Sequence, residues 1–229
     1  MKKYELTDET IEVYGTALHR IKALKDFGNV KKGELGGYVE SERNLSQEGN
    51  CWVYSNARVY SNARVYGNAW VYGNAWVYGN AEVYDNAKVC GNAKVFGNAE
   101  VYGNAWVYGN AEVYDNAEVY SNAKVYSNAR VYGNAWVYGN AEVYDNAEVY
   151  DNAKVCGNAD YITIKGLGSK YRNTTIFRTK ENIAVKCGCF YGTLAEFVDK
   201  VKETHGNSKF AKEYLALIDL VKIHFELEE

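Results

Sequence analysis

The 229-residue sequence contains no proline, one methionine and only three histidines. The absence of proline excludes a proline-rich linker or a collagen-like rod, and a hydrophobic content of 47% argues against general disorder. The net charge of −3 provides no basic field for bulk binding of nucleic acid. Five cysteines form no dense disulfide framework, no secretory signal follows Met1, and no apolar run reaches the roughly 18 residues of a membrane span. We therefore expect a cytoplasmic protein with reduced thiols, no cofactor and no membrane partner.

One hexad, copied many times, dominates the chain. From Gly49 to Ile162 the sequence reads as 19 consecutive hexads of the form Gly/Ser/Asp-Asn-Ala-x-Val-Tyr, without an insertion. In an extended backbone, Ala and Val point to one side while x and Tyr point to the other. The x positions carry mostly charged residues, which cannot be buried unpaired, so we expect Ala and Val inside and Tyr outside. The Gly/Ser/Asp-Asn pair is typical of corners.

Hairpins would not place every Ala and Val side chain in one interior. A coil in which three hexads form each turn would do so. The pattern therefore predicts a mainly β protein, a parallel β-helix of about six coils of 18 residues with three outward faces. We divide the chain into an N-terminal β cap with a first irregular coil (1–48), the hexapeptide-repeat β-helix (49–160) and a small C-terminal α+β module (161–229). The module is expected to be β-β-β-α-α, with strands at 161–165, 174–178 and 183–187, and helices starting at Thr193 and Ser208.

The hexad also resembles the motif of left-handed parallel β-helix proteins. Residues 21–39, 44–54, 187–197 and 203–206 resemble parts of a group of hexapeptide-repeat proteins. This group is frequent in bacteriophages, prophages and bacteria, and its members often carry the label acetyltransferase. The resemblance implies the left hand of the helix, a phage or prophage accessory role and, in some relatives, acyl transfer. Against acyl transfer, the hexads contain no histidine to serve as a general base and no extruded loop, and no catalytic residue is assigned.

The aromatic residues of the hexads have two interpretations. Stacked tyrosines would stabilise the coil through ring contacts. Exposed aromatic stripes would instead form the interface of a homo-oligomer, a dimer or a trimer, because such residues are enriched at protein contacts. The interface candidates are Trp70, Trp76, Trp106, Trp136, Tyr72 and Tyr108.

Two further hypotheses concern the C-terminal module. Residues 166–172 read Gly-Leu-Gly-Ser-Lys-Tyr-Arg, and such a loop can present backbone N–H groups, a hydroxyl and two cations to a phosphate. The candidate anion site comprises Ser169, Lys170, Arg172, Thr174 and Thr175; the alternative is a flexible basic turn. Cys187, Cys189 and His205 are metal-ligand candidates, although the Cys-x-Cys spacing is more typical of two partly buried thiols.

The leading functional hypothesis from these patterns is a non-enzymatic, oligomeric scaffold that binds a host or phage macromolecule, with inhibition of a host defence as one form of it. The alternative is binding or sequestration of a nucleotide or another phosphorylated small molecule by the C-terminal basic hairpin. A second alternative is an acyltransferase-like enzyme.

Overall fold

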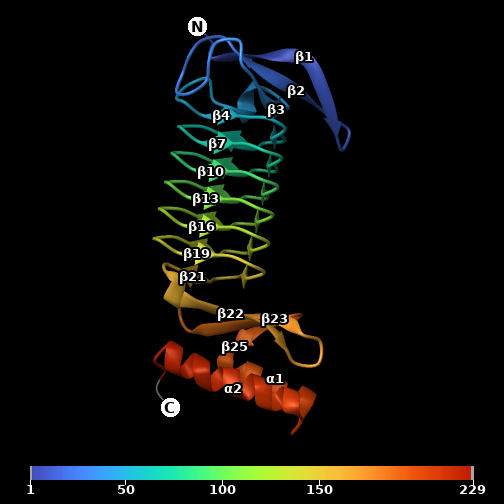
Figure 1. The fold of residues 1–229 in the computed structure, drawn as a ribbon, viewed down its shortest axis with the longest axis vertical. Helices are drawn as coiled ribbons and strands as arrows, with labels where there is room; N and C mark the ends of the chain where they lie inside the picture. Colours follow the sequence, from blue (N-terminus) through green and yellow to red (C-terminus); the bar gives the residue numbers. More distant parts are fainter. Residues whose placement is uncertain (1, 228–229) are drawn as a thin grey trace.

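A computed structural model describes residues 2–227 and shows an elongated coil covered at both ends (Figure 1). At the N-terminus, β1 (Tyr4–Val13) and β2 (Thr16–Ala23) form an antiparallel hairpin that extends sideways from the coil. β3 (Leu35–Val39) and the short helix η1 (Glu42–Asn44) follow. β3 pairs antiparallel with β2 and parallel with β5, so it joins the hairpin to the coil.

The hexads form a parallel β-solenoid with one two-residue strand per hexad. These strands are β4 (Trp52–Val53), β5 (Arg58–Val59), β6 (Arg64–Val65), β7 (Trp70–Val71), β8 (Trp76–Val77), β9 (Glu82–Val83), β10 (Lys88–Val89), β11 (Lys94–Val95), β12 (Glu100–Val101), β13 (Trp106–Val107), β14 (Glu112–Val113), β15 (Glu118–Val119), β16 (Lys124–Val125), β17 (Arg130–Val131), β18 (Trp136–Val137), β19 (Glu142–Val143), β20 (Glu148–Val149) and β21 (Lys154–Val155). Every third strand pairs in parallel, which gives three sheets. β3 and the bridge between Leu45 and Val65 add an irregular turn before the hexads, so the solenoid has about seven turns.

Alanine and valine fill the interior, as the alternation predicts. Each hexad alanine from Ala57 to Ala153, and each valine from Val53 to Val155, is at most 1% exposed. The outward residues donate their backbone N–H groups to the next coil, as Trp70 does to the carbonyl oxygen of Ala87 at 3.0 Å. Proline would remove such a donor, which is one physical reason for its absence from the hexads.

The corners are held by side chains as well as by backbone. Asparagines 18 residues apart donate Nδ2 to Oδ1 along each corner, for example from Asn62 to Asn80 at 3.0 Å. The residue before each hexad asparagine from Asn50 to Asn152 has a positive φ, such as +72° at Gly97 and +56° at Asp85. Glycine, aspartate and serine at this position follow from that requirement. The last predicted hexad departs from this pattern, because Gly157 has a φ of −149° and Ala159 is exposed.

The tyrosines stack into ladders along the outside. Tyr66, Tyr84 and Tyr102 are half-buried, and their ring centroids lie 4.8–4.9 Å apart in nearly parallel planes. Three outward positions differ from expectation, because Tyr60 and Cys90 are buried and Trp52 is fully buried against Tyr4 and Phe27 of the N-terminal cap. In the first coil, a tryptophan at an outward hexad position therefore belongs to the hydrophobic core, because the N-terminal cap covers it.

The C-terminal region begins with the short helix η2 (Asn158–Asp160) and has four strands where the sequence pattern indicated three. The elements are β22 (Tyr161–Leu167), β23 (Arg172–Arg178), β24 (Ile183–Cys187), β25 (Phe190–Thr193), α1 (Leu194–His205) and α2 (Lys209–His224). The sequence pattern does not indicate β25, because this strand is short and follows a tight turn at Gly188, whose φ is +59°.

This sheet lies between the end of the solenoid and the two helices (Figure 1). Phe177 and Ala184 on one face join the core of the solenoid, whereas Ile176 and Val185 on the other face pack with α1 and α2. A bridge between Ala153 and Thr179 continues the backbone pairing from the last coil into the sheet. The C-terminal region is therefore a cap that shares the solenoid core, and we call it the C-terminal cap. Neither helix described in residues 2–227 is long and apolar enough to cross a membrane.

Candidate functional site

The C-terminal cap contains a cavity of about 320 Å³ between the β22–β23 loop, the β24–β25 turn and the two helices. We call it the basic pocket. It is lined by Ser169, Lys170, Arg172, Cys187, Cys189, Phe190, Phe197, Lys200, Val201, Thr204, His205 and Tyr214. Three residues proposed for an anion site and three proposed for a metal site thus border one cavity. Their convergence could not be read from the sequence, because 169–172 and 187–205 meet only through the fold.

The loop that carries Lys170 is fastened to α2. Glu213 Oε2 accepts a hydrogen bond from the Gly168 N–H at 3.0 Å, and the Tyr214 hydroxyl donates to the Leu167 carbonyl oxygen at 3.4 Å. A side chain at Gly168 would collide with the Tyr214 ring, which explains this glycine. The expectation of free backbone donors in this loop is therefore wrong at Gly168, since its N–H is already bonded.

The charged residues that line the basic pocket are all basic. Lys170, Arg172 and Lys200 border it, together with His205, and no carboxylate of the described residues lines it. Lys200 also pairs with Glu203 at 2.8 Å, and this contact raises the pKa of Lys200. Lys170 and Arg172 carry no such ion pair in the described part of the chain, so they are the cations most available to a ligand.

Thr174 and Thr175 do not belong to this pocket. Both are fully buried, and as neighbours in a strand they point to opposite faces of the sheet. The Thr174 hydroxyl lies 3.2 Å from Cys187 Sγ, and the Thr175 hydroxyl accepts a hydrogen bond from the Glu148 N–H at 3.2 Å. Thr175 therefore attaches the cap to the solenoid, which corrects its proposed role in anion binding.

The metal-ligand candidates border the pocket without forming a cluster. The Cys187 thiol is buried beside Thr174 and the Tyr214 hydroxyl, whereas Cys189 is exposed. His205 stacks on the Tyr214 ring, with centroids 5.8 Å apart. Within residues 2–227, no three His, Cys, Asp or Glu side chains are grouped so that they could hold a metal ion. Burial, and then the hydrogen bond with Cys187, raises the pKa of Tyr214.

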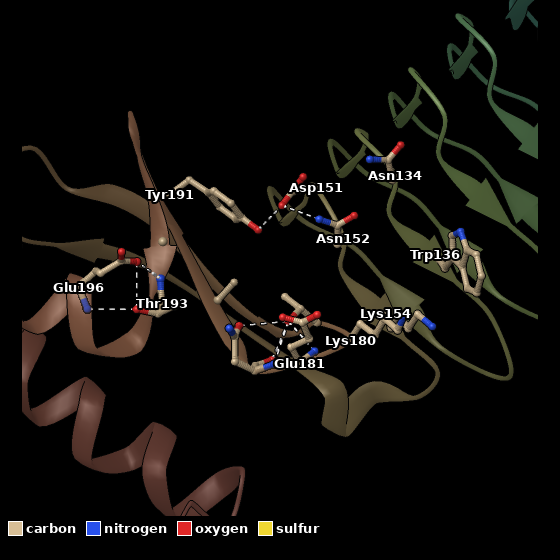
Figure 2. A pocket seen from close by; sticks show the side chains of 14 residues that line it. Asn134, Trp136, Asp151, Asn152, Lys154, Lys180, Glu181, Tyr191, Thr193 and Glu196 are labelled. Atoms are coloured by element: carbon tan, nitrogen blue, oxygen red, sulfur yellow. Dashed lines mark hydrogen bonds between the residues drawn. The ribbon is translucent and has the colours of Figure 1, made fainter.

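A second, larger cavity of about 630 Å³ lies where the solenoid meets the cap (Figure 2). We call it the junction groove. It is lined by Asn134, Trp136, Asp151, Asn152, Lys154, Thr179, Lys180, Glu181, Asn182, Ala184, Tyr191, Gly192, Thr193 and Glu196. Figure 2 shows Trp136 and Lys154 on the solenoid side, across the groove from Thr193 and Glu196 of the cap. Of these residues, only Trp136 is among the site candidates that the sequence indicates, because the groove exists only once the cap is in place.

Asp151 lies at the last corner of the hexad coils, beside this groove, and bonds to the C-terminal cap. Within the solenoid, the corner residue Asp115 accepts a hydrogen bond from the Gly133 N–H of the next coil at 3.3 Å. Asp151 occupies the same corner where the hexad coils stop, and its carboxylate instead accepts the Tyr191 hydroxyl at 2.8 Å. Burial, and then this bond, raises the pKa of Tyr191. The cap thus satisfies a corner carboxylate that has no further coil to bond.

The six aromatic interface candidates do not form one surface. Trp70, Tyr72, Trp106 and Tyr108 lie on the face built on β4, β7, β10, β13, β16 and β19, whereas Trp76 and Trp136 lie on the other two faces. On the shared face, the Lys88 ammonium lies 5.3 Å from the Trp70 ring centroid and 5.6 Å from that of Trp106. The Lys88 side chain therefore covers part of the Trp70 and Trp106 rings.

Comparisons with known proteins agree with this fold. The family model described as YdcK Beta solenoid repeat matches residues 53–73, 63–79, 123–139 and 129–144. The repeats are β-solenoid repeats. The chain is also 40% identical over 62 residues to a protein of Escherichia coli (strain K12) named "Uncharacterized acetyltransferase YdcK". This match covers 24% of the chain and 19% of that relative, so the chain spans about a fifth of the relative's length. The resemblance to solenoid proteins labelled acetyltransferases is thereby confirmed.

Proposed function

We propose that the protein binds an anionic, phosphorylated small molecule in the basic pocket and that the solenoid serves as its rigid support. The observation that carries this proposal is the convergence of Lys170, Arg172 and Lys200 on a pocket that no carboxylate of residues 2–227 lines. Cations that line a pocket with no carboxylate among its described lining residues attract an anion, even though Lys200 is also paired with Glu203. Arg172 can bind phosphate oxygens with two parallel hydrogen bonds.

The pocket also has the size and lining of a small-molecule site. Ligand pockets commonly enclose about 300–1,000 Å³ and combine an apolar lining with a few polar groups. Here Phe190, Phe197 and Tyr214 supply the apolar part, while the Ser169 hydroxyl lies beside the cations. The cap's attachment to a stiff solenoid, through Thr175 and Tyr191, holds these elements in place.

Isothermal titration calorimetry tests this proposal with inorganic phosphate, nucleoside phosphates, sugar phosphates and coenzyme A as probes. We expect at least one phosphorylated probe to bind, and the Lys170→Ala/Arg172→Ala double variant to lose about tenfold or more in affinity, because charge-assisted hydrogen bonds contribute about 1.5–3 kcal/mol each. Lys202→Ala is the matched control, since Lys202 is exposed on the same helix as Lys200 but does not line the pocket. Binding that is equally strong in the double variant, or binding by no probe, would contradict the proposal.

A second candidate function, the non-enzymatic interaction scaffold, is favoured by a different observation. Trp106 is 36% exposed and Tyr144 is 39% exposed, and both lie on the face built on β4 to β19. A partner, either a second copy or a host protein, would bury this aromatic surface. Light scattering at micromolar to millimolar concentrations tests self-association. We expect Trp106→Ala to weaken it and Trp136→Ala, on another face, to leave it unchanged; a strict monomer would rule out the homo-oligomer.

A further inference from the structure

The junction groove presents an indole ring whose face is within reach of a ligand. Trp136 is 36% exposed, and the Lys154 ammonium lies 4.4 Å from its ring centroid. A contact of this kind requires access to the π face of the ring. Because Lys154 is a flexible side chain only partly buried, a ligand with a flat apolar face can take its place on the ring.

Uncharged amides and hydroxyls supply much of the polar lining. Asn134, Asn152, Asn182 and Thr179 border the groove. An amide places a donor and an acceptor side by side, and a hydroxyl is both donor and acceptor, so these groups match ligands that carry neighbouring hydroxyls.

The corner ladder leaves one of these amides with a free donor. Asn134 Oδ1 accepts a hydrogen bond from Asn116 Nδ2 at 3.1 Å, which continues the ladder. The next corner residue, Asn152, instead donates its own Nδ2 to Asp151 at 3.0 Å. The Nδ2 of Asn134 consequently has no hydrogen-bond acceptor among residues 2–227 and is available beside Trp136.

The charges around the groove disfavour an anion. Lys154 and Lys180 are set against Asp151, Glu181 and Glu196. Two of these carboxylates already accept hydrogen bonds, Asp151 from Tyr191 and Glu196 from the Thr193 N–H at 2.8 Å. The lining therefore has no excess of positive charge, in contrast to the basic pocket.

We propose that the junction groove binds a neutral oligosaccharide, with one sugar ring stacked on Trp136 and its hydroxyls bonded to the amides of Asn134 and Asn152. A pyranose ring combines a flat apolar face with an edge of hydroxyls, which is the combination that the indole and the amides accommodate. The groove volume of about 630 Å³ exceeds that of the basic pocket and leaves room for more than one sugar ring.

Titration calorimetry of the full chain with malto-, cello- and chito-oligosaccharides tests the proposal. We expect one series to bind, and Trp136→Ala to lower the affinity at least tenfold. Trp70→Ala is the matched control, because Trp70 occupies the same hexad position on another face and does not line the groove. Equal affinity in Trp136→Ala and the native chain, or binding of none of the three series, would overturn the proposal.

Asn152→Ala provides a second readout that leaves the aromatic core untouched. Asn152 is exposed, so the variant is expected to fold and to bind the same oligosaccharide several-fold more weakly. Its unchanged affinity would overturn the assigned hydrogen bonds. The Lys170→Ala/Arg172→Ala variant should keep full oligosaccharide affinity, so failure at one site is distinguishable from failure at the other.

Discussion

The hydroxyl of Tyr84 donates a hydrogen bond of 2.7 Å to the carboxylate of Glu100, sixteen residues further along the chain. The same pairing recurs between Tyr66 and Glu82 at 2.6 Å and between Tyr102 and Glu118 at 2.8 Å. Each tyrosine thus contacts the next coil twice, through its stacked ring and through its hydroxyl. Phe96 stacks at 4.8–4.9 Å on its own face without a hydroxyl, so the ring alone maintains the ladder spacing.

These two contacts can be separated at Tyr84. We expect Tyr84→Phe to lower the free energy of unfolding by about 1 kcal/mol, because only the hydrogen bond is lost. Tyr84→Ala also removes ring contacts with both neighbours and should cost about 3 kcal/mol. Urea unfolding followed by circular dichroism measures both values. If the two variants lost equal stability, the stacking would contribute nothing.

Corner glycines give a second prediction. At Gly97, where φ is +72°, a Cβ atom would lie 2.8 Å from the backbone nitrogen of Asp115. We expect Gly97→Ala to lower the free energy of unfolding by about 1–2 kcal/mol, because it combines backbone strain with this close approach.

Ser121→Ala is the control for this variant. Ser121 has a similar φ of +59° but already carries a Cβ atom, so its truncation should change stability by less than about 0.5 kcal/mol. Similar losses in the two variants would show that the next coil does not restrict the corner at Gly97.

The solenoid was predictable from the sequence because one pattern fixed it many times over. The alternation of Ala and Val with outward residues determines the core, and the unbroken hexad places residues 18 apart in register. Trp52 is the clearest exception, since its full burial depends on Tyr4 and Phe27 from a cap with no repeat. The position of a residue in the hexad predicts whether its side chain points inward or outward. It does not predict which residues outside the repeat cover that side chain.

The candidate sites were predictable only in part. Basic residues in a glycine-containing loop indicated Lys170 and Arg172, which line the basic pocket. Because side chains alternate along a strand, the sequence already predicts that the adjacent Thr174 and Thr175 point to opposite faces of the sheet. Lys200 gave no local signal, because it reaches the pocket through the packing of α1 against the sheet. The junction groove joins residues 134–154 to residues 179–196, and no local pattern predicts how a cap sits on a coil.

The bond between Tyr191 and Asp151 predicts how firmly the cap is attached. Tyr191→Phe removes the hydroxyl but keeps the ring beside Tyr150, whose centroid is 4.9 Å away. We expect a loss of about 1 kcal/mol and faster amide hydrogen exchange in residues 161–193, with no change in the middle coils. Tyr171→Phe is the control, because Tyr171 is 68% exposed. Unchanged exchange in the cap would mean that this hydrogen bond does not hold it.

Alkaline pH should unfold the solenoid through its tyrosine ladders. Burial is the main cause that raises the pKa of Tyr60, Tyr114 and Tyr126 from 10 to about 12. The folded chain therefore holds these phenol protons more tightly than the unfolded chain does. Their contribution to stability is complete below about pH 10 and is lost as the pH rises through about 12.

We accordingly expect the phenolate absorbance to rise and the far-ultraviolet circular dichroism signal to fall together between these two pH values. The measurement is a parallel titration of the native chain by both signals, with the chain in concentrated urea as the control, where tyrosines should ionise near pH 10. Ladder tyrosines that ionise near pH 10 while the circular dichroism remains unchanged would contradict the prediction, because the phenols would then titrate without loss of the coil.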